Sequence, residues 1–193
     1  MVDAILTEGG RVCEEVLFPL NKPGDEQGCT RHPDGTVSTP DGFKAAYDAY
    51  CEGGWTSLAA PEEFGGQGLP HVIGTAMEEF RMAANQALPM YTGLTMGAVA
   101  SILVKGSPEQ KATYVPKMIS GEWCGTMNLT ESHAGTDLGM IRTRAEPQMD
   151  GSYKITGTKI FISGGDHDLT DNIIHLVLAK TPDAPESSKG ISL

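Results

Sequence analysis

The sequence predicts an α+β fold, in which an all-helical N-terminal half is followed by an antiparallel β half. Two observations carry this prediction. Up to about Gly121 the apolar residues recur at helical spacing, whereas after Glu122 they alternate in short runs bounded by Gly, Pro and Asp. We therefore place a helical domain at residues 1–122 and a β domain at residues 123–193.

Five segments of the first half have helical patterns. The run at residues 90–106 is apolar on all sides and is therefore expected to be buried. Ser107 can cap the next helix, with Gln110 closing a capping box, and that helix should end by Gly121. The expected helices are residues 2–20, 39–54, 71–84, 90–106 and 107–121.

The second half contains five candidate strands. The last begins at Gly190, and its apolar run starts three residues before the end of the sequence. Such a strand would leave the ladder of its partner unpaired, so we expect the chain to be a fragment of a longer protein. The candidate strands are residues 123–129, 141–147, 152–163, 172–180 and 190–193.

Composition excludes several classes of function. The 193 residues carry 14 Lys and Arg against 25 Asp and Glu, a net charge of −11 that would repel nucleic acid and anionic lipid. No apolar run approaches the roughly 20 residues of a membrane helix, and the N-terminus lacks a signal-peptide pattern, so we expect a cytoplasmic protein. The four cysteines are widely spaced and should be free thiols. His167 lies between Asp166 and Asp168, where a polar turn is favoured over a metal site, so no metal is predicted.

The first candidate binding stretch is residues 126–136. Strand alternation sends Met127 and Leu129 to one face and Thr130 to the other. Gly135 then allows close approach of the backbone, and the amides there, with the hydroxyls of Thr130 and Thr136, could donate to an electron-rich ligand. Taken alone, this stretch also fits a surface turn.

The second candidate stretch is "TKIFISGGD". Phe161 and Ser163 are two residues apart, so they share one face, while Ile160 and Ile162 turn towards the core. An aromatic ring beside a hydroxyl suits a flat heteroaromatic ligand. Taken alone, Phe161 also fits a core residue.

Together and in order, four segments resemble the acyl-CoA dehydrogenase family of flavoproteins. They are "APEEFGGQGLP", "GSPEQKATYVPKMISGEW", "MNLTESHAGTDLG" and "YKITGTKIFISGGDHD". The sequence departs from the family pattern at Ser132, His133, Thr136 and Phe161, where proline, a small residue, serine and tryptophan are usual. A hydroxyl is kept at Thr136 and an aromatic ring at Phe161. The run from Gly164 to Pro185 further resembles a branch of larger members that includes 3-methylmercaptopropionyl-CoA dehydrogenases.

The resemblance implies an N-terminal helical domain, an incomplete β-barrel-like middle domain, and a second helical domain that this sequence lacks. It also implies FAD as cofactor and oxidation of an acyl-CoA to its trans-2-enoyl-CoA, a reaction of fatty acid metabolism. The catalytic base comes from the second helical domain, so the base cannot be named and the fragment is expected to be inactive alone. Electron-transfer flavoprotein is the expected acceptor, and the full-length protein is expected to be a homo-oligomer.

The resemblance also assigns roles to residues of both stretches. Thr130 would donate to the pyrimidine side of the flavin, Thr136 would lie by the pyrophosphate and the incoming acyl-CoA, and Ser163 would lie near the hydride-accepting nitrogen. Glu131 is expected to be a structural partner for the backbone or an arginine. The residues implied to bind FAD are Met127, Leu129, Thr130, Gly135, Thr136, Phe161, Ile162 and Ser163.

Two alternatives remain open from the sequence. Acyl-CoA oxidases and flavin-dependent monooxygenases have a similar scaffold and differ in how reduced flavin meets oxygen. A non-catalytic module could instead bind an acyl group or a partner protein through the buried helix that contains Gly93, Thr95, Gly97 and Ala98.

Overall fold

A computed structural model describes all residues, 1–193, and shows two compact units. The helical unit comprises Met1–Gly125 and Asp166–Ile174, and the β unit comprises Thr126–Gly165 and His175–Leu193. The predicted α+β class, helices first and strands second, is confirmed. The predicted domain boundary after residue 122 stays a prediction, because compact packing does not by itself show which segments fold independently.

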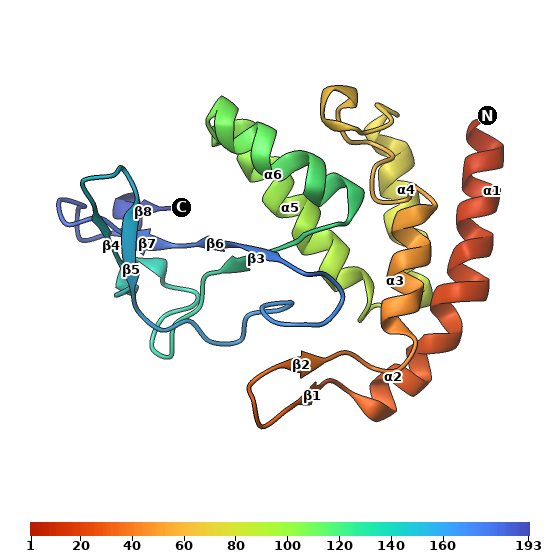
Figure 1. Cartoon of the computed structure of the whole chain (residues 1–193), viewed down its shortest axis with the longest axis horizontal. Helices are drawn as coiled ribbons and strands as arrows, with labels where there is room; N and C mark the ends of the chain where they lie inside the picture. The colour runs from red at the N-terminus through yellow and green to blue at the C-terminus, as the bar shows by residue number, and fades with distance from the viewer. The chain divides into compact units, whose positions relative to one another are not determined.

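Four of the five predicted helices of the helical unit have the expected positions (Figure 1). The apolar helix α5 packs beside α6 and buries Thr95, Ala98 and Val99, but Met90 and Val104 are exposed, so the predicted burial holds for one face only. The four helices are α3 (Phe43–Glu52), α4 (His71–Ala84), α5 (Pro89–Lys105) and α6 (Pro108–Ser120), with a short 3-10 turn at Glu62–Phe64.

The prediction of one helix over residues 2–20 is wrong in detail. The chain forms α1 (Val2–Val12), then a π-helical turn and a 3-10 turn, and then α2 (Asn21–Gln27). Pro19 cannot donate a backbone hydrogen bond, which breaks the α-helical ladder at this point. Gly9 weakens the sequence pattern but has a packing role, since a Cβ there would lie 2.6 Å from the sulfur of Met77 on α4.

A short hairpin of the helical unit was not predicted. Strands β1 (Thr30–Arg31) and β2 (Val37–Ser38) pair antiparallel around a turn in which Asp34 accepts hydrogen bonds from the backbone and hydroxyl of Thr36. Two-residue strands are too short to show alternation, so no periodic signal exists for them.

The segment Asp166–Ile174 packs with the helices although strands flank it in the sequence. Leu169 is 1% exposed within the helical core. Asp168 accepts hydrogen bonds from the backbone N–H and the hydroxyl of Thr39, at 2.9 and 2.7 Å. The structure contains no group of three or more His, Cys, Asp and Glu side chains that could hold a metal ion.

The capping box predicted for α6 is present. The Ser107 hydroxyl accepts from the Gln110 backbone N–H at 3.1 Å, and the Gln110 side chain accepts from the Ser107 N–H at 2.8 Å. The helix ends at Gly121, whose φ of +83° is the left-handed conformation that glycine adopts easily.

We expect Ser107→Ala to lower the free energy of unfolding by about 1 kcal/mol, because the Gln110 N–H in the first turn of α6 loses its acceptor. Urea unfolding followed by circular dichroism measures this change. Ser101→Ala is the matched control, since the Ser101 hydroxyl only bonds the Gly97 carbonyl within α5 and alanine favours a helix interior. Equal losses from the two variants would contradict the capping role.

The β unit contains a four-stranded sheet in the order β5-β4-β7-β8, and β3 pairs separately with β6. The sheet is open rather than a closed barrel (Figure 1). The strands are β3 (Cys124–Asn128), β4 (Arg144–Pro147), β5 (Tyr153–Thr156), β6 (Ile173–Val177), β7 (Ala179–Lys180) and β8 (Ile191–Ser192).

Two predictions about these strands are wrong. The sheet is not purely antiparallel, because β4 and β7 pair in parallel at Arg144 and Lys180. Parallel pairing needs a long connection between the two strands, and the chain between β4 and β7 is long enough to provide it. The strand predicted over residues 152–163 ends at Thr156. Gly157 lies so close to Thr143 that a Cβ would be 2.3 Å from its hydroxyl oxygen, and the chain leaves the ladder there.

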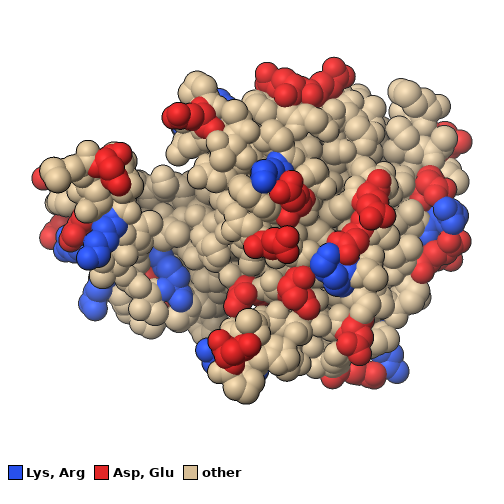
Figure 2. All heavy atoms as spheres, viewed as in Figure 1, with Lys and Arg blue, Asp and Glu red and all other residues tan.

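Charge is distributed unevenly between the units. The helical unit holds eight Lys and Arg against 19 Asp and Glu, whereas the β unit holds six of each, so the net charge of −11 belongs to the helical unit. On the face shown in Figure 2, carboxylates dominate the surface of the helical unit, whereas basic and acidic side chains both lie on the β unit. No helix is both long enough and apolar enough to cross a membrane.

Candidate functional site

The structure brings the two candidate stretches together within the β unit. We call residues 126–136 the first segment and residues 159–165 the second segment. The Ile160 N–H donates to the Thr130 carbonyl at 2.9 Å, and the Thr126 hydroxyl donates to the Ser163 carbonyl at 2.7 Å. These bonds fix the two segments side by side.

The first segment begins as strand β3 and then turns sharply. Met127 lies in β3, whereas Leu129 and Thr130 follow its end, and all three side chains are half-buried. The backbones of Glu131 and Ala134 then exchange two hydrogen bonds, at 2.8 and 3.1 Å. This tight turn places Gly135 and the exposed Thr136 directly after it.

The second segment is an irregular loop that presents an aromatic ring to solvent. Phe161 is 89% exposed, and with φ of +56° it is the only non-glycine residue of the chain with a positive φ. Ile160 and Ile162 are half-buried and Ser163 is exposed, so the predicted division between core-facing and outward residues holds without the predicted strand. A strained, exposed aromatic residue between two hydrogen-bonded neighbours is typical of a ligand-binding position.

The hydroxyls expected to contact a ligand have no partner within the protein. No hydrogen bond within the chain engages the side-chain oxygens of Thr130, Thr136 or Ser163. In contrast, the hydroxyls of Thr126 and Thr143 are both occupied by protein acceptors. The three predicted donors are therefore available to an added ligand.

Glu131 is buried, at 4% exposed, and its carboxylate organises the backbone around the turn. It accepts hydrogen bonds from the N–H groups of Arg142 and Thr143 at 2.7 and 3.0 Å and from the Thr143 hydroxyl at 2.6 Å. Burial raises the pKa of this carboxyl, but the hydrogen bonds from Thr143, Arg142 and Lys159 outweigh burial and lower the pKa to about 2. Glu131 therefore has the structural role that the sequence indicated, with a lysine in place of the expected arginine.

Lys159 is the residue of this site that sequence reasoning missed. Its ammonium group, on a side chain 7% exposed, donates to the Leu129 carbonyl and to the Glu131 carboxylate, both at 3.0 Å. A lysine inside an apolar run, matched by a carboxylate in the neighbouring stretch, is the signal that could have revealed it. His133 also lies near this pair, with its Nε2 3.6 Å from the Glu131 carboxylate and 3.1 Å from the Met140 carbonyl.

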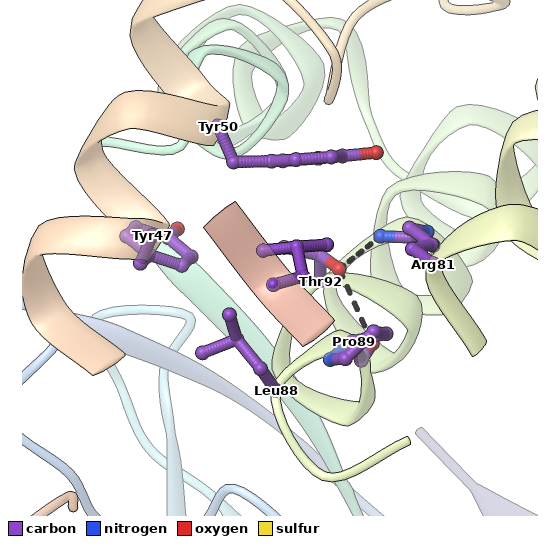
Figure 3. A pocket seen from close by; sticks show the side chains of 7 residues that line it. Tyr47, Tyr50, Arg81, Leu88, Pro89 and Thr92 are labelled. Carbon is purple, nitrogen blue, oxygen red and sulfur yellow. Dashed lines mark hydrogen bonds between the residues drawn. The ribbon is translucent and has the colours of Figure 1, made fainter. Parts of the chain in front are cut away.

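The helical unit contains a buried arginine, Arg81, that lines two cavities. Arg81 is buried, forms an ion pair with Glu78, donates to the Thr92 hydroxyl and lies 5.7 Å from the centre of the Tyr50 ring (Figure 3). The cavity drawn there has a volume of about 10 Å³, which is room for one water molecule at most. An adjoining cavity of about 210 Å³ is lined by both apolar and polar side chains, with Glu78 and Arg81 among the polar ones.

Comparison with known proteins identifies the chain's family. Residues 31–122 match the family description "Acyl-CoA dehydrogenase, N-terminal domain". The chain is 50% identical to 3-methylmercaptopropionyl-CoA dehydrogenase of Ruegeria pomeroyi over 98% of its length. The chain belongs to the acyl-CoA dehydrogenase family. A butyryl-CoA dehydrogenase of Syntrophomonas wolfei is 43% identical over 99% of this chain.

The fold agrees with this membership. The crystal structure of an acyl-CoA dehydrogenase from Geobacillus kaustophilus superimposes on the whole chain with a TM-score of 0.79 at 24% identity, and the match covers 46% of that structure. The chain spans about a third of the length of the two curated relatives, 32% in each case. The family resemblance inferred from the four sequence motifs is therefore confirmed, together with the α+β fold.

Proposed function

We propose that this chain forms the flavin-binding wall of an enzyme that oxidises an acyl-CoA to a trans-2-enoyl-CoA with FAD as cofactor. The observation that carries the proposal is the juxtaposition of the two segments around the exposed ring of Phe161. Family membership supports the chemistry, and the free hydroxyls of Thr130 and Ser163 fit the donors that an isoalloxazine ring requires.

The residues of the two segments would act by binding and orientation. Bound FAD would supply the acceptor for the hydride that leaves the β-carbon of the substrate. Phe161 offers a flat apolar surface to the flavin ring, and Thr130 and Ser163 offer hydroxyl donors to its polar edge. Fixed donors of this kind stabilise negative charge on a reduced ring without reorganisation. Thr136 and the backbone at Gly135 would contact the pyrophosphate and the acyl-CoA.

The test is a titration of the 15N-labelled chain with FAD, followed by amide chemical shifts. We expect saturable shift changes concentrated at residues 127–136 and 161–163. Riboflavin and adenosine diphosphate, titrated separately, report on the ring-binding and pyrophosphate-binding parts. A lack of shift changes up to about 1 mM FAD, which corresponds to about −4 kcal/mol of binding free energy, would contradict the proposal.

The choice between dehydrogenase and oxidase concerns the protein that carries this chain. We propose a dehydrogenase, because both curated relatives are named as dehydrogenases, with electron-transfer flavoprotein as the acceptor that the family resemblance implies. An acyl-CoA panel assayed with an artificial electron acceptor and with an oxygen electrode separates the two. Reduction of the dye without oxygen uptake supports the dehydrogenase, and stoichiometric oxygen uptake supports the oxidase.

A further inference from the structure

The ammonium group of Lys159 joins the two segments of the candidate site. Lys159 belongs to the second segment, and both of its acceptors, the Leu129 carbonyl and the Glu131 carboxylate, belong to the first. The next residue, Ile160, donates its N–H to the Thr130 carbonyl. Three consecutive residues of the first segment are thus held by two consecutive residues of the second.

The use of a buried lysine at this point has a physical cost. Removing an ammonium group from water is unfavourable unless a counter-ion and hydrogen bonds compensate, and a packed apolar side chain often provides equal stability. The side chains of Lys159 and Glu131 are 7% and 4% exposed, so water provides little compensation. An apolar residue could fill this space, but it could not engage a carbonyl of one segment from the other.

The position of the bonds links Lys159 to cofactor binding. Phe161 follows Lys159 by two residues, and Leu129 and Thr130 are among the residues expected to line the flavin. The distance between the ring of Phe161 and the hydroxyl of Thr130 therefore depends on the bonds that Lys159 and Ile160 make. A binding site that is already ordered in its bound conformation before the ligand binds loses less conformational entropy on binding.

We infer that Lys159 is a positioning residue that holds the two flavin-lining segments at their binding distance in the cofactor-free protein, with Glu131 as its counter-ion. This inference rests on the proposed function for its significance. Its structural part concerns the chain without any cofactor and is tested without one.

The first measurement is amide hydrogen exchange of the cofactor-free chain. We expect Lys159→Met to raise the exchange rate of the Ile160 amide about tenfold more than the exchange rates of the amides of β4 and β5, since hydrogen bonds to charged groups are the stronger class. Lys180→Met is the matched control. Lys180 also donates its ammonium group to a backbone carbonyl of the β unit, that of Gly139 at 2.6 Å, but this bond does not join the two segments.

Two further variants separate positioning from general stability. Lys159→Arg keeps a cation that can reach both acceptors and should restore protection of the Ile160 amide. Should Lys159→Met fail to fold, the double variant Glu131→Gln with Lys159→Met removes both buried charges together. Unchanged exchange at Ile160, or an equal rise at Ile160 and throughout β4 and β5 in these variants, would overturn the inference.

The second measurement is FAD affinity. If Lys159 positions the segments, Lys159→Met weakens FAD binding about tenfold, whereas Lys180→Met leaves it unchanged and Lys159→Arg largely restores it. Faster exchange at Ile160 with unaltered FAD affinity overturns the positioning role. Failure of the unaltered chain to bind FAD contradicts the proposed function instead, and the exchange experiment still decides whether Lys159 holds the segments together.

Discussion

Glu131→Gln is expected to lower the free energy of unfolding by about 3 to 5 kcal/mol, because it leaves the buried ammonium group of Lys159 without a counter-ion. An amide nitrogen would also face backbone N–H donors that now point at a carboxylate oxygen. Urea unfolding measures the change. Glu146→Gln is the matched control, since Glu146 is exposed on β4 and forms no ion pair. A loss below about 1 kcal/mol for Glu131→Gln would show that the carboxylate is not needed.

The same carboxylate predicts a pH dependence of stability. The pKa of Glu131 is lowered from 4.5 to about 2 in the folded chain, so the unfolded state binds a proton first as the pH falls. Ionised Glu131 therefore contributes about 3 kcal/mol to the free energy of unfolding. This contribution is fully present above about pH 4.5 and is lost as the pH falls towards 2. We expect this part of the acid sensitivity to disappear in Glu131→Gln. Parallel stability curves for both proteins between pH 5 and pH 2 would contradict the assignment.

The local signals in the sequence predicted the parts of the fold that depend on neighbouring residues. The capping box of Ser107 and Gln110 and the glycine stop at Gly121 involve residues close in sequence, and both are present. The resemblance indicated both segments of the candidate site, and the structure shows that they meet at Thr130 and Ile160. Which of their residues bind FAD stays a prediction.

Long-range pairing explains what the sequence did not reveal. Asp168 bonds Thr39 across 129 residues, and nothing in the polar run around His167 predicts that it packs with helices. The parallel pairing of β4 with β7 likewise depends on packing and not on any local pattern. The predicted strand over residues 152–163 failed for a related reason, since it rested on a local sequence pattern, whereas all four residues of β5 are exposed and the backbone leaves the ladder after Thr156.

Phe161→Gly is expected to weaken FAD binding about tenfold while leaving the protein as stable as before or more stable by about 1 kcal/mol. A non-glycine residue in the left-handed region costs about 1 to 3 kcal/mol, and glycine relieves that strain at a cost of about 0.4 to 1 kcal/mol in chain entropy. Little burial is lost, because the ring is already 89% exposed. Loss of a stacking aromatic ring typically costs about 1 to 3 kcal/mol of binding to a flat heteroaromatic partner.

Phe161→Ala separates the two effects, because alanine removes the ring and keeps the strained backbone. We expect both variants to bind FAD equally weakly, with Phe161→Gly more stable than Phe161→Ala in urea unfolding. Opposite changes in stability and affinity in Phe161→Gly would show that the strain at residue 161 is retained for ligand binding and not for folding. Undiminished FAD affinity in both variants would show that Phe161 is not part of the FAD-binding surface. A large loss of stability in Phe161→Gly would instead mean that its ring packs against the protein.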